Sequence, residues 1–253
     1  MKLVCWNVNG IRAVWKKGFR DFLDAEQPDI LCVQETKIQH DQLTEALRSP
    51  AGYRSYWNAA EKKGYSGTAT FTREEPARVA TEFGSPVLDA EGRIVHTEFP
   101  DFHLFNVYFP NSAMGPERLR HKLSFYDEFL RLAESLRRSG KGIVVCGDVN
   151  TAHEEIDLAR PKENATSPGF LPVERQWVSR LLAHGYVDTF RLFTREPGHY
   201  TWWDLKSGAR ARNVGWRIDY FFVSEELRPR VRAAGILPHV LGSDHCPITL
   251  TLG

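Results

Sequence analysis

The sequence predicts an α/β protein in which two β-sheets pack face to face and helices cover their outer sides. Several short runs are apolar and rich in β-branched residues, as in strands buried on both faces, and Ile143–Cys146 is the clearest of them. Helical segments lie between some of these runs, but without the strict strand–helix alternation of a parallel sheet. The middle of the chain is instead a series of hairpin-like strands separated by Gly and Pro.

The strands are predicted from their apolar or alternating character and from the turn residues that bound them. They are expected, in chain order, at Leu3–Trp6, Asp29–Gln34, Tyr53–Trp57, Gly67–Thr72, Arg93–Phe99, His103–Phe109, Ile143–Cys146, Trp216–Val223, Val231–Leu237 and Pro247–Leu252.

The helices are predicted from apolar residues at helical spacing. They are expected at Trp15–Glu26, Asp41–Leu47, Pro116–Arg138 and Val173–Ala183. Pro28 ends the first helix, and Gly140 lies just beyond the longest one, which begins with a proline. Two long segments are expected to be loops, the polar stretch 150–172 and the Trp- and Arg-rich stretch 200–213.

The composition is that of a soluble globular protein. The chain has 253 residues, of which 42% are hydrophobic and 26% charged, so we expect one domain spanning residues 1–253. The formal net charge of +1 means that any basic surface for a nucleic acid must be local. The sequence has no signal-peptide pattern and no membrane-spanning run. We therefore expect a cytoplasmic monomer without membrane contact or an obligate protein partner.

The four cysteines show no metal-binding or redox spacing. Cys5, Cys32 and Cys146 lie in strand-like runs, and Cys246 follows a histidine. Buried, reduced thiols are the expected state.

Polar side chains follow three of the predicted strands at the point where each strand ends. These residues are Asn7, Glu35 and the pair Asp148 and Asn150. In an extended segment the side chains of Asp148 and Asn150 point to the same side. Burying an unpaired carboxylate is costly, so Asp148 requires a cation, a proton or a cleft.

A second set of polar residues lies near the C-terminus. Asp244 and His245 precede the last strand, and Asp219 lies early in another strand. Carboxylates, amide oxygens and a histidine without thiolates suit Mg²⁺ better than a structural zinc. Such a set predicts phosphoryl transfer, with a metal on the phosphate and a carboxylate or His245 activating water. Asp219 is the candidate to orient His245. Taken singly, each residue could also be an ordinary turn or cap residue.

Six motif blocks occur in the order typical of one enzyme family. They are Trp6-Asn7-Val8-Asn9-Gly10, Gln34-Glu35-Thr36-Lys37, Tyr108-Phe109-Pro110-Asn111, Gly147-Asp148-Val149-Asn150-Thr151-Ala152-His153, Gly215-Trp216-Arg217-Ile218-Asp219-Tyr220 and Gly242-Ser243-Asp244-His245-Cys246-Pro247. Together they resemble the exonuclease III/AP endonuclease family of the endonuclease–exonuclease–phosphatase superfamily, over essentially the whole chain.

The resemblance implies a four-layer α/β/β/α sandwich of the DNase I-like type, with two packed mixed β-sheets flanked by helices. It implies Mg²⁺-dependent cleavage 5′ to an abasic site in duplex DNA, with Mn²⁺ able to substitute. It also implies 3′→5′ exonuclease activity and removal of blocked 3′ ends.

The same resemblance assigns roles to individual residues. The metal site would involve Asn7, Asn9, Glu35, Asp148, Asn150, Asp244 and His245. The catalytic set would be Tyr108, Asp148, Asn150, Asp219 and His245. Asn9 stands where some relatives carry an acid. Whether Asp148 or His245 takes the proton from water stays open.

DNA contacts are expected from loops around this site. The residues implied are Arg12, Tyr65, Tyr108, Asn111, Met114, Asn164, Trp202, Arg212, Trp216 and Ile218. Three of these residues, Trp202, Trp216 and Ile218, would line a pocket for a flipped-out abasic sugar. Further basic candidates are Lys16, Lys17, Lys62, Lys63, Arg118, Arg120, Lys122, Arg210 and Arg217. For the helical set 118–122 a solvated surface is the alternative, and for Trp203 we favour core packing.

Two other functions stay open. The same hydrolase core could cleave an inositol phosphate or sphingomyelin, although the sequence has no hydrophobic membrane-binding insertion. The chain could also be a non-catalytic binding module on a nuclease scaffold, which the complete set of acids and His245 argues against.

Overall fold

The computed structural model describes residues 1–50 and 52–253 and contains the two predicted sheets. In spatial order the first sheet consists of β11 (Val231–Ile236), β12 (Ile248–Leu252), β1 (Lys2–Asn7), β2 (Ile30–Gln34), β4 (Thr68–Thr72) and β3 (Arg54–Asn58). The second consists of β5 (Arg78–Ala80), β6 (Ile94–Glu98), β7 (Phe102–Tyr108), β8 (Gly142–Asp148), β10 (Asp219–Ser224) and β9 (Tyr186–Asp188). The pairs β1–β2 and β7–β8 are parallel, and the other ladders are antiparallel.

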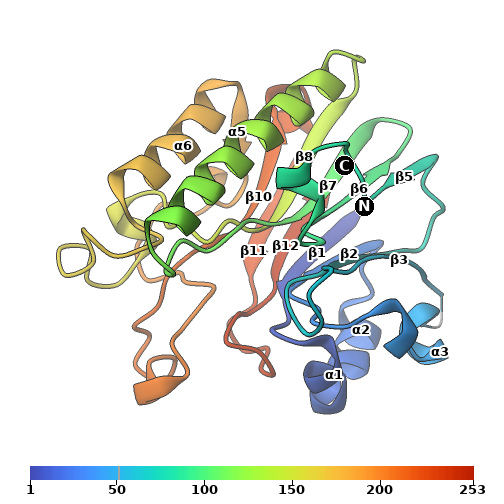
Figure 1. Ribbon diagram of the computed structural model, residues 1–253, viewed down its shortest axis with the longest axis horizontal. Helices are drawn as coiled ribbons and strands as arrows, with labels where there is room; N and C mark the ends of the chain where they lie inside the picture. Colours follow the sequence, from blue (N-terminus) through green and yellow to red (C-terminus); the bar gives the residue numbers. More distant parts are fainter. Residues whose placement is uncertain (51) are drawn as a thin grey trace.

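Helices cover the outer side of each sheet, so the molecule has four layers (Figure 1). On the first sheet lie α1 (Ile11–Val14), α2 (Arg20–Glu26) and α3 (Glu45–Arg48), with a wide turn at Trp15–Phe19. On the second sheet lie α4 (Pro86–Asp89), α5 (Pro116–Arg137) and α6 (Pro172–Ala183). Single 3₁₀ turns occur at His40–Gln42, Glu155–Asp157, Phe190–Leu192 and Lys206–Gly208, and a longer 3₁₀ helix at Glu225–Arg230.

Three apolar layers hold this arrangement together. Along β8, Ile143 and Val145 pack against the outer helices, whereas Val144 and Cys146 pack between the two sheets. A strand buried on both faces needs a continuous apolar sequence, which explains why this run is so distinct. All four cysteines are buried and free, as expected.

Several element boundaries differ from the prediction. The first helix begins at Ile11 rather than Trp15, and Lys17 and Gly18 leave helical geometry, with φ of 98° at Gly18. A 3₁₀ turn and the one-turn α3 replace the helix predicted at 41–47. The edge strands β5 and β9 were not predicted, and β10 begins at Asp219 rather than Trp216. Among the described residues, no helix combines the length and apolarity needed to cross a membrane.

Candidate active site

The ends of β1, β2 and β8 meet at one edge of the sandwich. Asn7 ends β1, Glu35 follows β2 directly, and Asp148 ends β8. Asn7 Nδ2 donates hydrogen bonds to Asp148 Oδ2 at 2.9 Å and to Glu35 Oε2 at 3.2 Å. Asp219, the first residue of β10, pairs with Asp148 across the antiparallel ladder. The convergence required by the sequence hypothesis is therefore present.

A cavity of about 320 Å³ lies over these strand ends. Its lining residues are Asn9, Glu35, Tyr108, Asn111, Asp148, Asn150, Pro168, Gly169, Trp202, Trp216, Ile218, Asp244 and His245. All except Pro168 and Gly169 were predicted, and no motif or charge marks those two in the sequence. Asn7 and Asp219 lie behind the cavity and contact its lining residues.

The backbone around the cavity has unusual geometry. Gly147 has a φ of 144°, and a Cβ there would lie 1.7 Å from the carbonyl oxygen of Val107, so only glycine fits beside β7. Asn9, Glu35 and Asn150 have φ values of 44°, 56° and 54°. Non-glycine residues adopt this left-handed region at a cost, and such strain is concentrated at functional sites.

Asp148 is held by hydrogen bonds and is 1% exposed. Its Oδ1 accepts the backbone N–H of Asn150 at 2.8 Å, and its Oδ2 accepts Asn7 Nδ2. Burial, together with the negative charge of Asp219, raises the pKa of Asp148 to about 7, although the positive charge of His245 opposes the rise. A carboxylate with this pKa is suited to exchange a proton near neutral pH.

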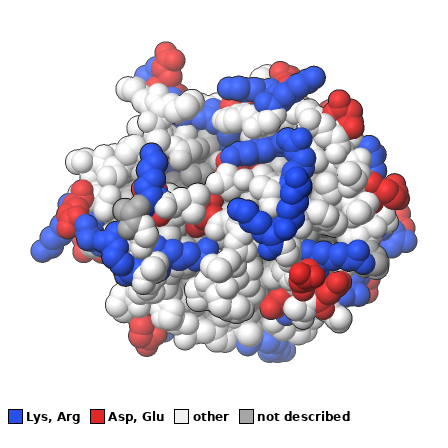
Figure 2. Space-filling model, turned by 90° about the horizontal axis from the view of Figure 1, so that it is seen from below, with Lys and Arg blue, Asp and Glu red and all other residues white. Residues whose placement is uncertain are grey.

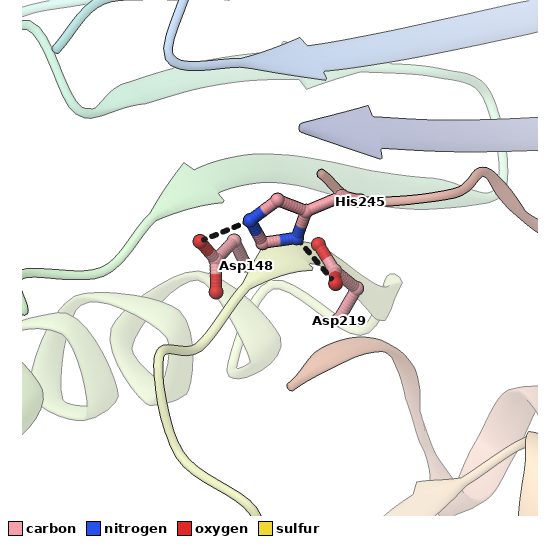
Figure 3. Close-up of side chains that lie close together, drawn as sticks. All are labelled: Asp148, Asp219 and His245. Carbon is pink, nitrogen blue, oxygen red and sulfur yellow. Dashed lines mark hydrogen bonds and ion pairs between the residues drawn. The ribbon is translucent and has the colours of Figure 1, made fainter. Parts of the chain in front are cut away.

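His245 lies between two carboxylates (Figure 3). Its Nδ1 is 2.8 Å from Asp219 Oδ2, and its Nε2 is 3.8 Å from Asp148 Oδ2. Burial alone would lower the pKa of His245, but the charges of Asp219 and Asp148 outweigh burial and raise it to about 10. Thr201 Oγ1 also donates to Asp219 Oδ2, at 2.6 Å. His245 is therefore an oriented imidazolium, and Asp219 is its predicted orienter.

A set of oxygen donors lies beside this acid–histidine–acid chain. Glu35 and Asp244 carry the carboxylates, and Asn9 Nδ2 donates to Asp244 Oδ1 at 2.9 Å. Burial opposes ionisation of Asp244, but the charge of His245 and the hydrogen bond from Asn9 lower its pKa. Lys37 Nζ lies 2.9 Å from Glu35 Oε1 and 2.6 Å from Asn9 Oδ1. A positive charge is therefore accommodated at this position, and the oxygen donors fit a hard divalent cation.

A second set of residues that could bind a cation consists of Asp148, Asp219 and His245. Their potential ligand atoms lie within 4.8 Å of one another. The hydrogen bond between Asp219 and His245 already uses one donor atom of each. This trio is suited to transferring a proton, whereas the carboxylate oxygens of Glu35 and Asp244 could hold a cation.

Hydrogen-bond donors form one wall of the cavity. Asn111 Nδ2 donates to Asn150 Oδ1 at 3.3 Å, and Asn150 Nδ2 donates to Phe109 O at 2.9 Å. The Arg93 guanidinium lies 4.6 Å from the centre of the Tyr108 ring. Burial and the nearby charge of Glu35 raise the pKa of Tyr108, so its hydroxyl stays protonated and can donate.

The opposite wall is aromatic. Trp202 and Trp216 meet edge to face at 6.4 Å, and Ile218 packs in the same apolar cluster. Trp202 Nε1 donates to Asp244 Oδ2 at 3.0 Å, which ties this wall to the carboxylates. Trp203 is buried and packs elsewhere, as we favoured.

The other residues predicted to contact DNA lie outside the cavity lining. Arg12, Met114 and Arg212 are exposed, with Met114 at 80%. Asn164 donates to Arg160 O at 3.0 Å. The remaining residue, Tyr65, is half-buried, and its hydroxyl accepts hydrogen bonds from Arg93 and Arg118. Seen from below, Lys and Arg side chains surround the middle of the molecule (Figure 2).

Four basic candidates make ion pairs or hydrogen bonds within the protein, and two of them are fully buried. Lys122 and Arg217 are buried in ion pairs, so neither the DNA contact nor the solvated helix surface considered for Lys122 is correct. Arg118 pairs with Glu91, and Arg210 donates to backbone carbonyls, including Ser243 O at 3.1 Å. The remaining basic candidates are exposed, namely Lys16, Lys17, Lys62, Lys63 and Arg120.

Besides Pro168 and Gly169, two residues that contact the site were not assigned a role in it. Thr201 supports Asp219, and Lys37 contacts Glu35. Thr201 carries no charge and lies 18 residues before Asp219. Lys37 belongs to the motif Gln34-Glu35-Thr36-Lys37, but the sequence alone does not indicate where its side chain points.

The chain belongs to the Endonuclease/Exonuclease/phosphatase family, whose model matches residues 4–245. Its sequence is 45% identical over 254 residues to the exodeoxyribonuclease of Bacillus subtilis (strain 168), covering 100% of this chain and 99% of that protein. It is 40% identical over 252 residues to the DNA-(apurinic or apyrimidinic site) endonuclease of Dictyostelium discoideum, covering 98% of this chain and 69% of that protein.

A solved structure agrees with these relatives. The AP endonuclease from Archaeoglobus fulgidus matches with a TM-score of 0.91 and 27% identity, covering 100% of this chain and 99% of that one. The resemblance to the exonuclease III/AP endonuclease family and the DNase I-like fold is confirmed.

Proposed function

We propose that this protein is a divalent-cation-dependent DNA-repair phosphodiesterase. It incises duplex DNA on the 5′ side of an abasic site, and it also removes nucleotides and blocking groups from 3′ ends. The observation that carries the proposal is a cavity in which Asp148 and His245, with Asp219 behind them, adjoin the carboxylates of Glu35 and Asp244. A non-catalytic module would not need this complete set.

Mg²⁺, or Mn²⁺ in its place, is the proposed cation. Glu35 would be the main ligand, with Asp244, Asn7 and Asn9 nearby. When bound, such a cation neutralises negative charge on the phosphate and on the leaving oxygen.

Asp148 is the proposed general base. Of the two candidates, His245 has a pKa of about 10 and is already protonated at neutral pH, whereas Asp148 has a pKa of about 7. Asp148 takes a proton from water while the water oxygen attacks phosphorus. The P–O3′ bond breaks as the new P–O bond forms, and O3′ takes a proton from solvent, so that the products are a 3′-hydroxyl and a 5′-phosphate on the abasic sugar.

Donors around the cavity stabilise the charge that develops on the phosphate. The Nε2–H of His245 and the hydroxyl of Tyr108 would donate to phosphate oxygens. Asn150 is also proposed to contact the phosphate, in exchange for one of the hydrogen bonds that its Nδ2 makes to Phe109 O and Asp148 Oδ2. Fixed donors of this kind require little reorganisation during the reaction.

The aromatic wall provides selectivity for a nucleotide without a base. Trp202, Trp216 and Ile218 form a compact apolar surface that suits an extruded sugar. Arg12, Tyr65, Asn111, Met114, Asn164 and Arg212 are proposed to contact the flanking duplex. Met114, which is 80% exposed, is proposed to enter the base stack.

The test is cleavage of a duplex that contains one tetrahydrofuran abasic analogue. Wild-type protein should incise it in Mg²⁺ but not in EDTA, and an undamaged duplex should stay uncut at internal positions. Asp148→Asn should lower turnover at least 10³-fold and leave DNA binding within about threefold. Absence of incision above background in Mg²⁺ would reject the proposal.

A further inference from the structure

A buried ion pair joins the two helices that cover the second sheet. Lys122 of α5 and Glu174 of α6 are both 0% exposed, and Lys122 Nζ lies 2.7 Å from Glu174 Oε1. The ammonium also donates to Asn150 O at 2.7 Å and to Thr151 Oγ1 at 2.9 Å. All three ammonium protons therefore have acceptors.

Glu174 uses both carboxylate oxygens. In addition to Lys122, Oε1 accepts the hydroxyl of Ser112 at 2.7 Å. Oε2 accepts the backbone N–H of Gly169 at 2.7 Å and that of Leu171 at 3.1 Å. Glu174 lies in the first turn of α6, where a negative charge interacts favourably with the helix dipole.

These contacts reach three separate loops behind the donor wall of the cavity. Ser112 follows Asn111, Lys122 binds the carbonyl of Asn150, and Glu174 binds the N–H of Gly169. Asn111, Asn150 and Gly169 all line the cavity. One ion pair therefore connects the three loops that carry the cavity-lining residues Asn111, Asn150 and Gly169.

Two of these loops have conformations that need support. Asn150 has a φ of 54°, and Gly169 has a φ of 88°. A Cβ on Gly169 would lie 3.1 Å from Asn150 O, so the two loops pack closely. Because Lys122 binds that same carbonyl oxygen, the ion pair fixes the peptide on which the Asn150 side chain is mounted.

We propose that Lys122 and Glu174 are positioning residues that hold Asn111, Asn150 and Gly169 in the geometry required for cleavage. The inference rests on the proposed function, since it assigns the wall a role in phosphodiester hydrolysis. Neither residue reaches the cavity, so the pair acts through the three loops. A wall displaced by about 1 Å can cost about 100-fold in rate.

The test compares a variant of the ion pair itself with a variant that removes one hydrogen bond to Glu174. Glu174→Gln keeps the size of the side chain but leaves one oxygen for acceptance, so it cannot serve Lys122, Ser112 and the backbone N–H groups of Gly169 and Leu171 together. Ser112→Ala removes one hydrogen bond and is the variant to use if Glu174→Gln does not fold.

The matched control is Asp127→Asn. Asp127 and Arg180 form an exposed ion pair between the same two helices. It lies in the outer groove between α5 and α6 rather than at the cavity. Its loss should leave kcat and KM within twofold of wild type.

Steady-state kinetics on the abasic duplex should separate positioning from general destabilisation. We expect Glu174→Gln to lower kcat 10- to 100-fold and Ser112→Ala to lower it 3- to 10-fold, with KM within threefold in both. Amide hydrogen exchange of Gly169 should accelerate at least tenfold in Glu174→Gln but not in Ser112→Ala. Unchanged kcat in a folded variant whose Gly169 amide has been released would overturn the proposal, as would unchanged kcat in Ser112→Ala if Glu174→Gln does not fold.

A duplex with a 3′-phosphate serves as a second substrate. If wild-type protein is inactive on the abasic duplex but active on the 3′-phosphate, the incision proposal fails. The kcat of the variants on the 3′-phosphate then still tests the positioning role of the ion pair. If wild-type protein cleaves neither substrate, both proposals are overturned.

Discussion

Replacing Asp219 by Asn isolates the role of the carboxylate behind His245. Asp219 Oδ2 is 2.8 Å from His245 Nδ1 and accepts the Thr201 hydroxyl at 2.6 Å. Both Asp219 and His245 are buried, at 2% and 4% exposure, so water cannot readily replace the lost charge. The asparagine has the same shape but removes the negative charge and can present the wrong group to Nδ1.

The magnitude follows from the pKa of His245. A rise from 6.5 to about 10 corresponds to about 5 kcal/mol in favour of the imidazolium, and Asp219 is the largest favourable contributor, followed by Asp148. If Asp219 supplies about half and the same interaction stabilises the transition state, its loss removes about 2 to 3 kcal/mol, which corresponds to a decrease of about 30- to 150-fold in kcat. DNA affinity should change little, because Asp219 lies behind the cavity.

Single-turnover cleavage of the abasic duplex measures this effect directly. Thr201→Val is the control, because it removes a hydrogen bond from a neutral donor to the same oxygen but leaves the negative charge of Asp219 in place, and it should cost about 1.5 kcal/mol, or about tenfold. An Asp219→Asn variant that stays within fivefold of wild type, or that matches Thr201→Val, would refute the reasoning.

Three further predictions concern the pocket, a buried cation and a buried histidine. Trp202→Ala should lower kcat/KM on the abasic duplex about 10- to 100-fold, from the ~1–3 kcal/mol of a stacking aromatic, and leave removal of 3′ nucleotides within threefold; equal losses on both substrates would contradict a role in sugar selection. Arg217→Met should lower the free energy of unfolding in urea by about 3–5 kcal/mol without weakening DNA binding, and the reverse pattern would restore the DNA contact that we rejected. Burial, together with the charge of His103, lowers the pKa of His96 to about 4 in the folded protein. The unfolded chain therefore binds the proton first, and this group should contribute a loss of about 2–3 kcal/mol of stability between pH 7 and pH 4.5. His96→Gln should flatten the urea-derived stability curve by that amount, and an unchanged curve would contradict the assignment.

The sequence was informative where chemistry coincides with strand ends. Glu35 and Asp148 were identified because each follows an apolar run with one residue between, and strands bring such positions to one edge of a sheet. The same logic could not give the edge strands β5 and β9, since three residues are too few to show a period of two.

Lys122 was misassigned although the sequence held a signal about it. It is in phase with the buried residues Phe125, Tyr126 and Phe129 on α5, and therefore lies on the inward face of that helix. Its partner Glu174 is 52 residues away, and no local pattern connects them. Helical phase can thus predict that a charge is buried, but not which group neutralises it.

Arg217 shows the same limit on the other side of the site. Its partners Asp157 and Asp188 lie in a loop and in an unpredicted strand. The charge appeared available for DNA because its neighbours in sequence are aromatic and apolar, whereas the acids that bury it come from elsewhere in the fold.

Lys122 and Arg217 lie at comparable distances along the chain from Asp148 and Asp219, Lys122 through the residue that it binds and Arg217 directly. Arg217 precedes Asp219 by two residues at the start of β10, and Lys122 binds the carbonyl of Asn150, two residues beyond Asp148 at the end of β8. β8 and β10 are hydrogen-bonded neighbours, so both sides of this catalytic pairing are backed by a buried ion pair. Hydrophobic packing alone tolerates small shifts of a strand end, whereas a buried charge that loses its partner costs several kcal/mol. With the proposed function, the ion pairs would penalise the displacements that separate Asp148, Asp219 and His245, and this would account for costly buried charges next to a site that requires fixed geometry.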